Sequence, residues 1–497
     1  MSEKKYILAL DQGTTSSRAI VFDLEGNTVS TGQHEFRQIY PQPGYVEHDP
    51  FEILSSQMSA AREALATVNA EEIAAIGITN QRETTIAWQR STGRPLYNAI
   101  VWQCRRGAPL CEQLIAEGEK QYIKDVTGLV IDSYFSASKM KWLLDNVPEV
   151  RRLADAGDLC FGTVDSWLLW NLTGGRVFAT DITNACRTML FDITKRDWDK
   201  HLLTRLGIPR SALPEVKPSA GQFGVSVENI FGCAIPITSI AGDQHAAMFG
   251  QCCFEEGVAK ITYGTGSFIL MNVGSKPPVS KSGLLATVAW QIGDDVVYAL
   301  EGSAFNAGSA IKWLRDELHI IETPQQADRW AEDVEDTAGI SFVPAFTGLG
   351  APRWDMYARG GLLGITRGAT NKHIARAVLE SIALQCCELV DAMTDDSGIP
   401  LREIRVDGGV SNSAFVMQYQ ADLLGIPVLR PRCVETTAIG AAMLAGLGCG
   451  VYSGIEELRS VWALDKRFEP EKPAEWAAEK KRIWNKAVER CSGWAEQ

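Results

Sequence analysis

The sequence predicts an α/β protein in which two similar halves face each other across a cleft. Strand-like and helix-like apolar patterns alternate along the 497 residues. A strand–turn–strand unit rich in glycine and hydroxyl residues, DQGTTSS from Asp11, is echoed by YGTGS from Tyr263. At roughly 100–200 residues per domain, the length allows two large domains or several small ones.

Composition and charge exclude several classes of protein. The chain is 45% hydrophobic and 22% charged, which is typical of a globular protein. Its net charge of −13 argues against nucleic acid or an anionic membrane as the main partner. The 12 cysteines include no C-x-x-C pair, so metal-ligand spacing is absent and a reducing, cytoplasmic compartment is favoured.

Neither the N-terminus nor the interior predicts a targeting or membrane segment. The start, MSEKKYILALD, has too short an apolar run for a signal peptide, whose core takes about 7–15 residues. The apolar stretch from Ala438 to Tyr452 is short and rich in glycine, so it predicts a buried helix rather than a span of about 20 residues. We therefore expect no integral membrane segment.

The first half alternates strands with amphipathic helices. Apolar runs predict strands at Tyr6–Leu10, Ala19–Phe22, Ile73–Thr79 and Thr84–Trp88. Apolar residues at helical spacing predict helices over Pro50–Val68 and within YFSASKMKWLLDNV, the second capped by Ser136 or Ser138.

The second half repeats this pattern. Strands are predicted at Lys260–Tyr263 and Phe268–Met271, and helices at Ser303–Leu318, Lys372–Met393, Ser413–Leu424 and Glu475–Cys491. The Lys372–Met393 helix is apolar nearly all round and should be buried. We expect the boundary near Phe249–Phe254, which gives one domain over residues 1–250 and another over 251–497.

The turn DQGTTSSR is suited to phosphate. Gly13 permits a tight turn, and the following residues offer hydroxyl and amide donors and a charged fork, from Thr14, Thr15, Ser16, Ser17 and Arg18. Asp11, at the strand end, is placed to hold Mg²⁺ through water. The alternative is a hairpin that merely happens to be rich in Ser and Thr. No Walker A motif is present.

Two more glycine-rich turns have both a functional and a plain interpretation. In YGTGS, Gly264 and Gly266 flank Thr265, which suits either a turn that contacts a phosphate group or an ordinary tight turn. In VDGGV, Gly408 and Gly409 would let a base or ribose approach the backbone. The alternative there is a βα turn capped by the following Ser or Asn.

Charged residues after two strands suggest substrate chemistry. Asp243 follows the apolar run Ile235–Ile240, where it would act as a general base on a substrate hydroxyl or as a helix N-cap. Arg82 and Glu83 follow Ile73–Thr79 and would grip a polyol, or else form a solvated ion pair. His245 is expected to be structural.

The order and number of these motifs resemble the FGGY family of carbohydrate kinases and, within it, the glycerol kinases. The motifs are DQGTTSSR, NQRETT, FGTVDSWLLW, GDQHAA, TYGTGSF and VDGG, and the resemblance runs from Tyr6 to about Gly450. YFSASKMKWLLDN and GGLLGITRGATNKHIARAVLE resemble the two signature segments of the family. The resemblance implies an actin/Hsp70/hexokinase-like (ribonuclease H-like) fold, ATP-dependent phosphorylation of glycerol to sn-glycerol 3-phosphate, a Mg²⁺ requirement, and a homodimer or homotetramer. A kinase of another polyol or sugar, or a non-catalytic ATP-binding switch, is the alternative.

The resemblance also implies residue roles. Asp243 is the implied catalytic base. The implied glycerol-binding residues are Arg82, Glu83, Tyr134, Asp243 and Gln244, with Trp102 and Phe268 as apolar walls. The implied nucleotide-binding residues are Thr14, Thr15, Ser16, Arg18, Thr265, Gly308 and Gly409, and the metal side is formed by Asp11 and Asp243. Lys312 and Ser413 stand near the nucleotide, where family members often have Gln and Asn. Residues 221–237 lack the Gly-rich basic run and the histidine through which some bacterial members are regulated.

Overall fold

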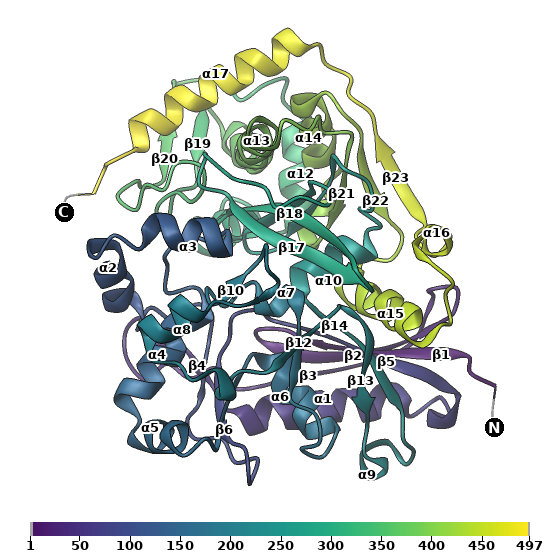
Figure 1. The fold of residues 1–497 in the computed structure, drawn as a ribbon. Helices are drawn as coiled ribbons and strands as arrows, with labels where there is room; N and C mark the ends of the chain where they lie inside the picture. Colours follow the sequence, from purple (N-terminus) through teal and green to yellow (C-terminus); the bar gives the residue numbers. More distant parts are fainter. Residues whose placement is uncertain (1–2, 496–497) are drawn as a thin grey trace.

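The computed structural model describes residues 3–495, in which thirteen strands form one continuous twisted sheet (Figure 1). The strands of the first half are β1 (Tyr6–Gln12), β2 (Ser16–Asp23), β3 (Thr28–Glu35), β5 (Ile73–Asn80), β13 (Ala220–Val225) and β14 (Pro236–Gly242). Those of the second half are β15 (Val258–Tyr263), β16 (Ser267–Asn272), β17 (Leu285–Ile292), β18 (Asp295–Ala304), β21 (Glu403–Asp407), β22 (Val428–Pro431) and β23 (Leu464–Phe468).

Helices pack against the faces of the sheet. The main ones are α1 (Pro50–Leu65), α4 (Ser136–Asn146), α10 (Asp243–Gly250), α11 (Gly308–Lys312), α13 (Asn371–Ser397), α14 (Ala414–Leu424), α15 (Thr436–Cys449) and α17 (Ala474–Cys491). Shorter elements are β4 (Glu47–His48), β6 (Ile86–Gln89), β7 (Ala99–Ile100), α2 (Ala108–Ala116), α3 (Lys120–Thr127), α5 (Pro148–Asp155), β8 (Leu159–Gly162), α6 (Val164–Leu172), β9 (Ala179–Asp181), α7 (Ile182–Ala185), β10 (Phe191–Asp192), β11 (Asp197–Trp198), α8 (Lys200–Leu206), β12 (Glu215–Lys217), α9 (Glu228–Phe231), α12 (Pro324–Glu332), β19 (Ser341–Val343), β20 (Gly361–Leu363) and α16 (Ile455–Leu458).

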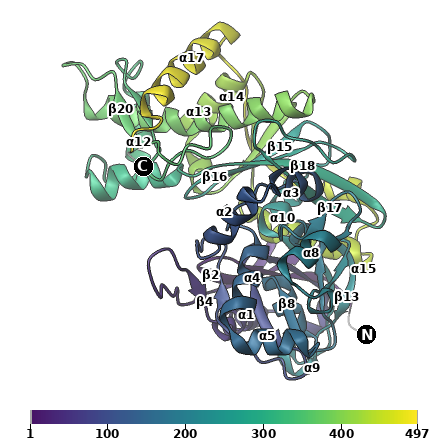
Figure 2. The same ribbon diagram turned by 60° about the vertical axis from the view of Figure 1, so that its left-hand side comes forward.

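The two halves share one strand topology. In the first half the order is β3-β2-β1-β5-β14, and in the second it is β18-β16-β15-β21-β22. In each half the opening strand pairs antiparallel with the next strand and parallel with a later one. Figure 2 shows the second half, in green and yellow, above the first, in purple and blue. The repeated topology confirms the internal echo that the two hairpin motifs predict.

Helix α15 of the second half packs against strands β1, β5 and β14 of the first half. Helix α15 also packs against α10 of the first half, backbone to backbone, because a Cβ on Gly440 would lie 1.8 Å from the carbonyl oxygen of Ala246 in α10. Ser239 of β14 donates a hydrogen bond to the carbonyl of Ala441 at 2.8 Å. The buried helix predicted at 438–452 is therefore confirmed, and it joins the halves.

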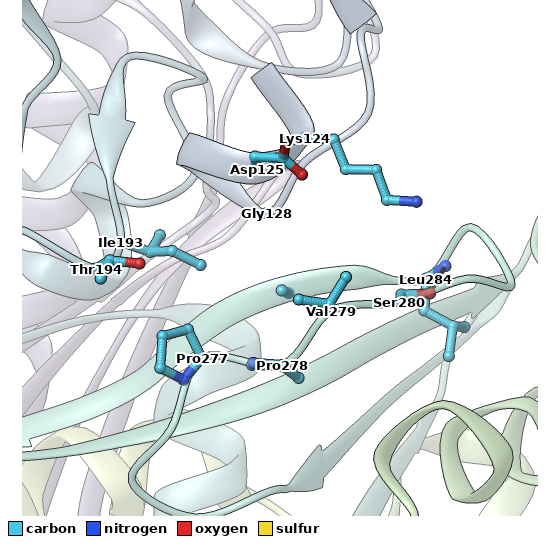
Figure 3. A pocket seen from close by; sticks show the side chains of 11 residues that line it. Lys124, Asp125, Gly128, Ile193, Thr194, Pro277, Pro278, Val279, Ser280 and Leu284 are labelled. Carbon is cyan, nitrogen blue, oxygen red and sulfur yellow. Dashed lines mark hydrogen bonds between the residues drawn. The ribbon is translucent and has the colours of Figure 1, made fainter. Parts of the chain in front are cut away.

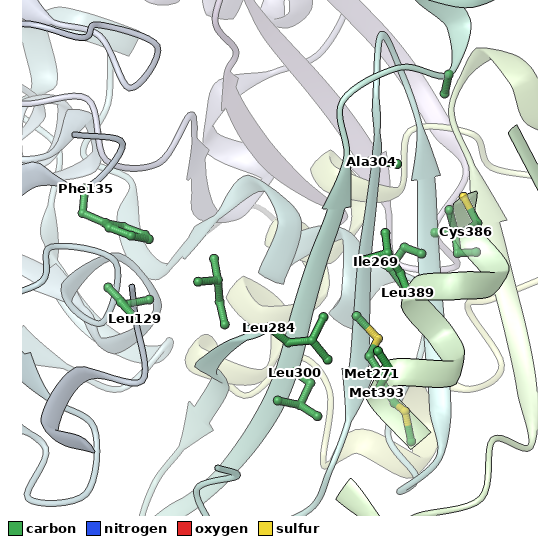
Figure 4. Packing of buried hydrophobic residues seen from close by; sticks show 14 of the residues in the cluster. Leu129, Phe135, Ile269, Met271, Leu284, Leu300, Ala304, Cys386, Leu389 and Met393 are labelled. Carbon is green, nitrogen blue, oxygen red and sulfur yellow. The ribbon is translucent and has the colours of Figure 1, made fainter. Parts of the chain in front are cut away.

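The second-half core lies between the sheet and α13. Ile269 and Met271 on β16 and Leu389 and Met393 on α13 are fully buried side by side (Figure 4). Gly302 on β18 leaves the room for this contact, since a Cβ there would lie 2.9 Å from a Leu389 methyl group. The prediction that this helix is buried is confirmed.

Three local predictions are wrong. The helix expected from Ser303 begins at Gly308, because Ser303 pairs with Phe268 and completes β18. The strand expected from Thr84 begins at Ile86. Neither serine caps α4: its N-cap is Phe135, while Ser136 donates to the carbonyl of Glu83 at 3.0 Å. None of the helices in residues 3–495 combines the length and hydrophobicity needed to cross a bilayer.

Candidate active site

The carboxyl ends of three parallel strands bring the main candidate residues together. β1 ends at Gln12, β5 at Asn80 and β14 at Gly242, and these three positions lie in register. The chain leaves β5 into Arg82 and leaves β14 into Asp243, so both side chains lie at the same edge as Asp11 of β1. Ligands of open α/β sheets bind beyond this edge.

Asp243 is the first residue of α10, whose N-cap is Gly242, so the interpretation of Asp243 as the cap is wrong. Its carboxylate accepts a hydrogen bond from the Gln244 backbone at 2.7 Å and lies 3.1 Å from Arg82 Nε. The side chain is 32% exposed, in contrast to the carboxylates beneath it. One side of the Asp243 carboxylate is therefore fixed by the Gln244 backbone and Arg82, and the other side is accessible to solvent.

A fully buried cluster of charges lies below Asp243. Arg82 donates two hydrogen bonds to Glu301 of β18, at 2.6 and 3.0 Å. Arg187 donates to Glu83 at 2.7 Å and to Glu301 at 3.1 Å. These four side chains are at most 2% exposed, so a solvated pair of Arg82 and Glu83 is excluded.

The cluster holds two guanidinium groups and two carboxyl groups, so its formal charges balance. Burial opposes the charge of Glu301, but Arg187 and Arg82 outweigh burial and hold the pKa of this carboxyl well below its usual range. Burial likewise opposes the charge of Arg82, and Glu301 and Glu83 raise its pKa well above the ordinary value. A rigid guanidinium is thus fixed beside Asp243.

Glu83 has an unusual backbone as well as a buried carboxylate. Its φ is +59°, a left-handed conformation that few residues with a side chain adopt and that concentrates at functional sites. Its carbonyl accepts hydrogen bonds from Ser136 at 3.0 Å and from Thr85 at 3.1 Å. Burial raises the pKa of Glu83, and Arg187 and Arg82 offset part of that rise.

Two aromatic side chains form a wall beside the cluster. Trp102 and Tyr134 pack edge to face with ring centroids 5.5 Å apart. The Arg187 guanidinium lies 5.6 Å from the Tyr134 ring. Trp102 Nε1 donates to Thr14 Oγ1 at 3.0 Å, which ties this wall to the first hairpin. Phe268 lies on β16 of the second half and is partly buried.

In the first hairpin, residues 11–18, some hydroxyl groups are buried in the core and others are accessible. Ser17 is buried and shares a hydrogen bond with Ser56 at 2.9 Å, so it belongs to the core. Thr15, at the turn, is exposed, and Ser16 Oγ accepts from Gln33 at 3.1 Å. Arg18 forms an ion pair with Glu435 of the second half, so its charged fork is already engaged.

The second hairpin meets α11 and the turn after β21. Gly308 donates to the carbonyl of Gly264 at 3.0 Å, and a Cβ on Gly308 would lie 2.6 Å from that oxygen. Gly408, with φ of +85°, approaches Tyr263 equally closely, whereas Gly409 faces open space. Three glycine-rich segments therefore converge on one open region.

The two remaining nucleotide candidates differ. Lys312 ends α11 with an exposed side chain. Ser413 is the N-cap of α14, where its hydroxyl accepts from Val416 and donates to Asp328 at 2.5 Å. Its hydroxyl is already used within the fold, so Ser413 fits a capping role better than a ligand contact.

Asp11 and Asp243 make a carboxylate pair suited to Mg²⁺. Burial raises the pKa of Asp11 to about 7, Arg18 opposes this and Asp243 adds to it. Among residues 3–495 no group of three or more His, Cys, Asp or Glu could hold a metal on its own. Magnesium is commonly bound by one or two carboxylates together with water and substrate phosphates, so the pair fits that ion.

Sequence patterns miss three charged residues of this region. They are Arg187 in NACRTML, Glu301 in VVYALEGSA and Lys260 in VAKITY. Each is a lone charge in an apolar or small-residue segment, and each is at most 2% exposed. A lone charge in a buried strand is itself a signal, because such residues are seldom buried without a partner. His245 is buried and bonded to Thr287 at 3.0 Å, in a structural role as predicted.

A separate cavity of about 290 Å³ lies between α3 and the loop around Val279 (Figure 3). It is lined by Lys124, Ile193 and Pro277 among others, and it contains none of the candidate residues. The site is therefore defined by the strand ends and not by this cavity.

Comparison with known proteins identifies the family. Residues 6–250 match the N-terminal domain of the FGGY family of carbohydrate kinases, and residues 259–449 match its C-terminal domain. The chain belongs to the FGGY family of carbohydrate kinases. Two FGGY relatives are glycerol kinase 2 of Thermotoga maritima and glycerol kinase of Caldanaerobacter subterraneus. They are 57% and 56% identical over 99% of this chain and 100% of their own lengths.

Solved structures agree with this FGGY assignment. Plasmodium falciparum glycerol kinase, crystallised with ADP, matches with a TM-score of 0.94 and 39% identity over 99% of both chains. A xylulose kinase of Lactobacillus acidophilus, 24% identical over 98% of this chain and 97% of its own, shares the fold with a TM-score of 0.88. The expected two-domain α/β kinase fold is confirmed.

Proposed function

We propose that this FGGY kinase transfers the γ-phosphoryl group of ATP to glycerol, giving ADP and sn-glycerol 3-phosphate. The observation that carries the proposal is Asp243, an accessible carboxylate held 3.1 Å from a buried arginine at the edge of three parallel strands. The support from relatives is that proteins 55–57% identical to this chain are glycerol kinases.

Glycerol is held by paired polar groups against an aromatic wall. Arg82, Glu83, Tyr134, Asp243 and Gln244 bind the hydroxyls in this proposal, with Trp102 and Phe268 beside the carbon chain. The edge-to-face pair of Trp102 and Tyr134 limits the space for longer polyols. An analogue that lacks a hydroxyl leaves buried polar groups of the site unpaired, and such a site discriminates strongly against it.

Asp243 accepts the proton of a terminal glycerol hydroxyl as that oxygen attacks the γ-phosphorus. The new O–P bond forms while the bond from the γ-phosphorus to the β-phosphate oxygen breaks, and ADP leaves. Arg82 fixes the carboxylate in place, because its own guanidinium is locked by Glu301. A positioned general base of this kind contributes about 10²–10⁴-fold to the rate.

ATP is bound on the side of the glycine-rich turns. The backbone around Thr14, Thr15 and Thr265 faces the phosphates, and Gly409 leaves open space for the nucleoside. Asp11 and Asp243 would hold Mg²⁺, which neutralises negative charge on the phosphates when it is bound. Lys312, whose side chain is exposed at the end of α11, contacts the nucleotide in this proposal.

Two further properties belong to the proposal. All twelve cysteines are free thiols, which supports a reducing, cytoplasmic compartment. A homodimer or homotetramer is the expectation from the family resemblance, and light scattering during size-exclusion chromatography measures it directly.

The substrate assignment is tested by ADP release over a panel of polyols and sugars. We expect kcat/KM for glycerol to exceed that for erythritol, xylitol and xylulose by at least tenfold. A higher value for one of the longer substrates would overturn the assignment and favour the alternative, an FGGY kinase of another polyol or sugar.

A further inference from the structure

Lys260 lies on β15 and reaches a candidate substrate residue from the opposite half of the molecule. Its side chain is fully buried. Nζ donates a hydrogen bond to Gln244 Oε1 and another to Thr262 Oγ1 at 2.8 Å. Gln244 lies in the segment 6–250 and Lys260 in the segment 259–449, so this contact crosses between the two FGGY domains.

This ammonium group has no direct ion pair. Among residues 3–495 Nζ forms no salt bridge, and both of its hydrogen-bond acceptors are neutral oxygens, of Gln244 and Thr262. Burial lowers the pKa of Lys260 to about 8, against the influence of Asp407 and Asp243. A buried ammonium without a counter-ion costs stability, so stability alone does not explain Lys260.

The hydrogen-bond chemistry fixes the orientation of the Gln244 amide. A lysine ammonium only donates, so the atom that faces Lys260 must be the amide oxygen. The planar amide then directs its NH₂ group away from Lys260. Within residues 3–495 this NH₂ group donates to no protein atom, while the Gln244 backbone is bonded to Asp243 at 2.7 Å. An unused donor is therefore left on Gln244, the residue that follows Asp243 in the chain.

We infer that Lys260 is a positioning residue: it fixes the Gln244 amide so that its NH₂ group donates to a hydroxyl of the polyol. The inference rests on the proposed function, since it deepens the account of the same substrate site. Without Lys260 the amide is free to turn its oxygen toward the substrate, and the donor is lost for part of the time. Thr262 accepts the second hydrogen bond of Nζ, and among residues 3–495 no hydrogen bond joins it to Gln244.

A double-mutant cycle tests this role. We expect Lys260→Met and Gln244→Ala each to raise the glycerol KM by roughly tenfold, with the ATP KM within about twofold of wild type. The double variant should be no worse than Gln244→Ala alone, because Lys260 acts through Gln244. Additive losses in the double variant, or an equal loss of ATP affinity, would overturn the inference.

Two other variants keep the test decisive if Lys260→Met folds poorly. Gln244→Glu still accepts from Lys260 and gains an ion pair, yet it has no NH₂ group to donate. We expect its melting temperature to rise while its glycerol KM also rises, and an unchanged KM would contradict the inference. Thr262→Val is the matched control, because it removes the other acceptor of Nζ and should leave KM within about twofold.

Failure of the substrate assignment is distinguishable from failure of this inference. Wild-type enzyme is first assayed on the polyol panel. If another polyol proves to be the substrate, the assignment to glycerol fails, and the same cycle is measured with that polyol. The inference then stands on the coupling between Lys260 and Gln244, and loss of that coupling overturns it.

Discussion

The charge balance of the buried cluster predicts that Glu301→Gln damages both stability and catalysis. Glu301 accepts two hydrogen bonds from Arg82, at 2.6 and 3.0 Å, and one from Arg187 at 3.1 Å. Glutamine keeps the shape of the side chain and removes its charge. Two buried guanidinium groups then share Glu83 as the one remaining fully buried carboxylate of this four-residue cluster.

The loss of stability expected for Glu301→Gln follows from this arrangement. Removing one partner of a buried ion pair costs about 3–5 kcal/mol, because the opposite charge stays buried without compensation. The amide oxygen of glutamine still accepts a hydrogen bond, so we expect the low end, ~3 kcal/mol. In a domain of about 150–250 residues each kcal/mol lowers the melting temperature by about 2–4 °C, which gives a fall of about 6–12 °C.

Catalysis should fall for a related reason. Arg82 loses its main counter-charge, and the nearest carboxylate left to it is Asp243, 3.1 Å from Nε. The stronger attraction draws the Asp243 carboxylate toward Arg82 and away from the substrate hydroxyl, so we expect kcat to fall by about tenfold or more. Calorimetry measures the melting temperature, and coupled ADP release measures kcat.

The pH dependence of this stability difference has a definite sign. The folded protein lowers the pKa of Glu301, so the stabilisation is complete above the ordinary glutamate pKa of about 4.3 and is lost as pH falls through the folded value. The gap in melting temperature between wild type and Glu301→Gln should therefore be constant from about pH 6 to 8 and narrow only in acid. Glu149→Gln, in an exposed pair with Arg152, is the control and should melt with wild type. A Glu301→Gln variant that matches wild type in melting temperature and kcat would refute the reasoning.

Three other substitutions should change turnover, substrate affinity or stability in a defined direction. Asp243→Asn should lower kcat by about 10²–10⁴-fold while glycerol still binds by calorimetry, and near-normal turnover would remove Asp243 as the base. Trp102→Phe keeps a six-membered aromatic ring but removes the five-membered ring and with it the donor to Thr14, 3.0 Å away, so KM for both substrates should rise about three- to tenfold; steady-state kinetics that match wild type would contradict this link. Gly440→Ala puts a Cβ where 1.8 Å separates it from the Ala246 carbonyl, so the melting temperature should fall by several degrees, in line with an overpacking cost of about 1–3 kcal/mol. An unchanged melting temperature for that variant would show that α15 does not pack as described.

Strand-end residues were predictable because of the geometry of parallel strands. Side chains at the carboxyl ends of neighbouring parallel strands meet at one edge of the sheet, so the positions and charges of Asp11, Arg82 and Asp243 predict them as candidates, and the family resemblance implies their roles. The repeated hairpins likewise followed from composition, because glycine and hydroxyl residues mark the turns. The start of α11 was not predictable, since the length of β18 is set by its pairing with β16.

The partners of these residues were not predictable from the sequence. Arg82 and Glu301 are 219 positions apart, and no local pattern links them. The four hydroxyls after Gly13 look equivalent in the sequence, yet Ser17 points into the core and bonds to Ser56. The ion pair of Arg18 with Glu435 of the other half likewise has no signal in the sequence, and the prediction that Arg18 binds the nucleotide stays a prediction. Each of these contacts depends on tertiary packing.

The most direct test of the proposed function is to identify the product. Purified protein is incubated with ATP, Mg²⁺ and glycerol, and the products are analysed by mass spectrometry alongside an Asp243→Asn control. We predict one glycerol 3-phosphate formed for each ADP released, and almost none in the control. ADP released without glycerol, or a phosphorylated product formed equally well by Asp243→Asn, would contradict the account.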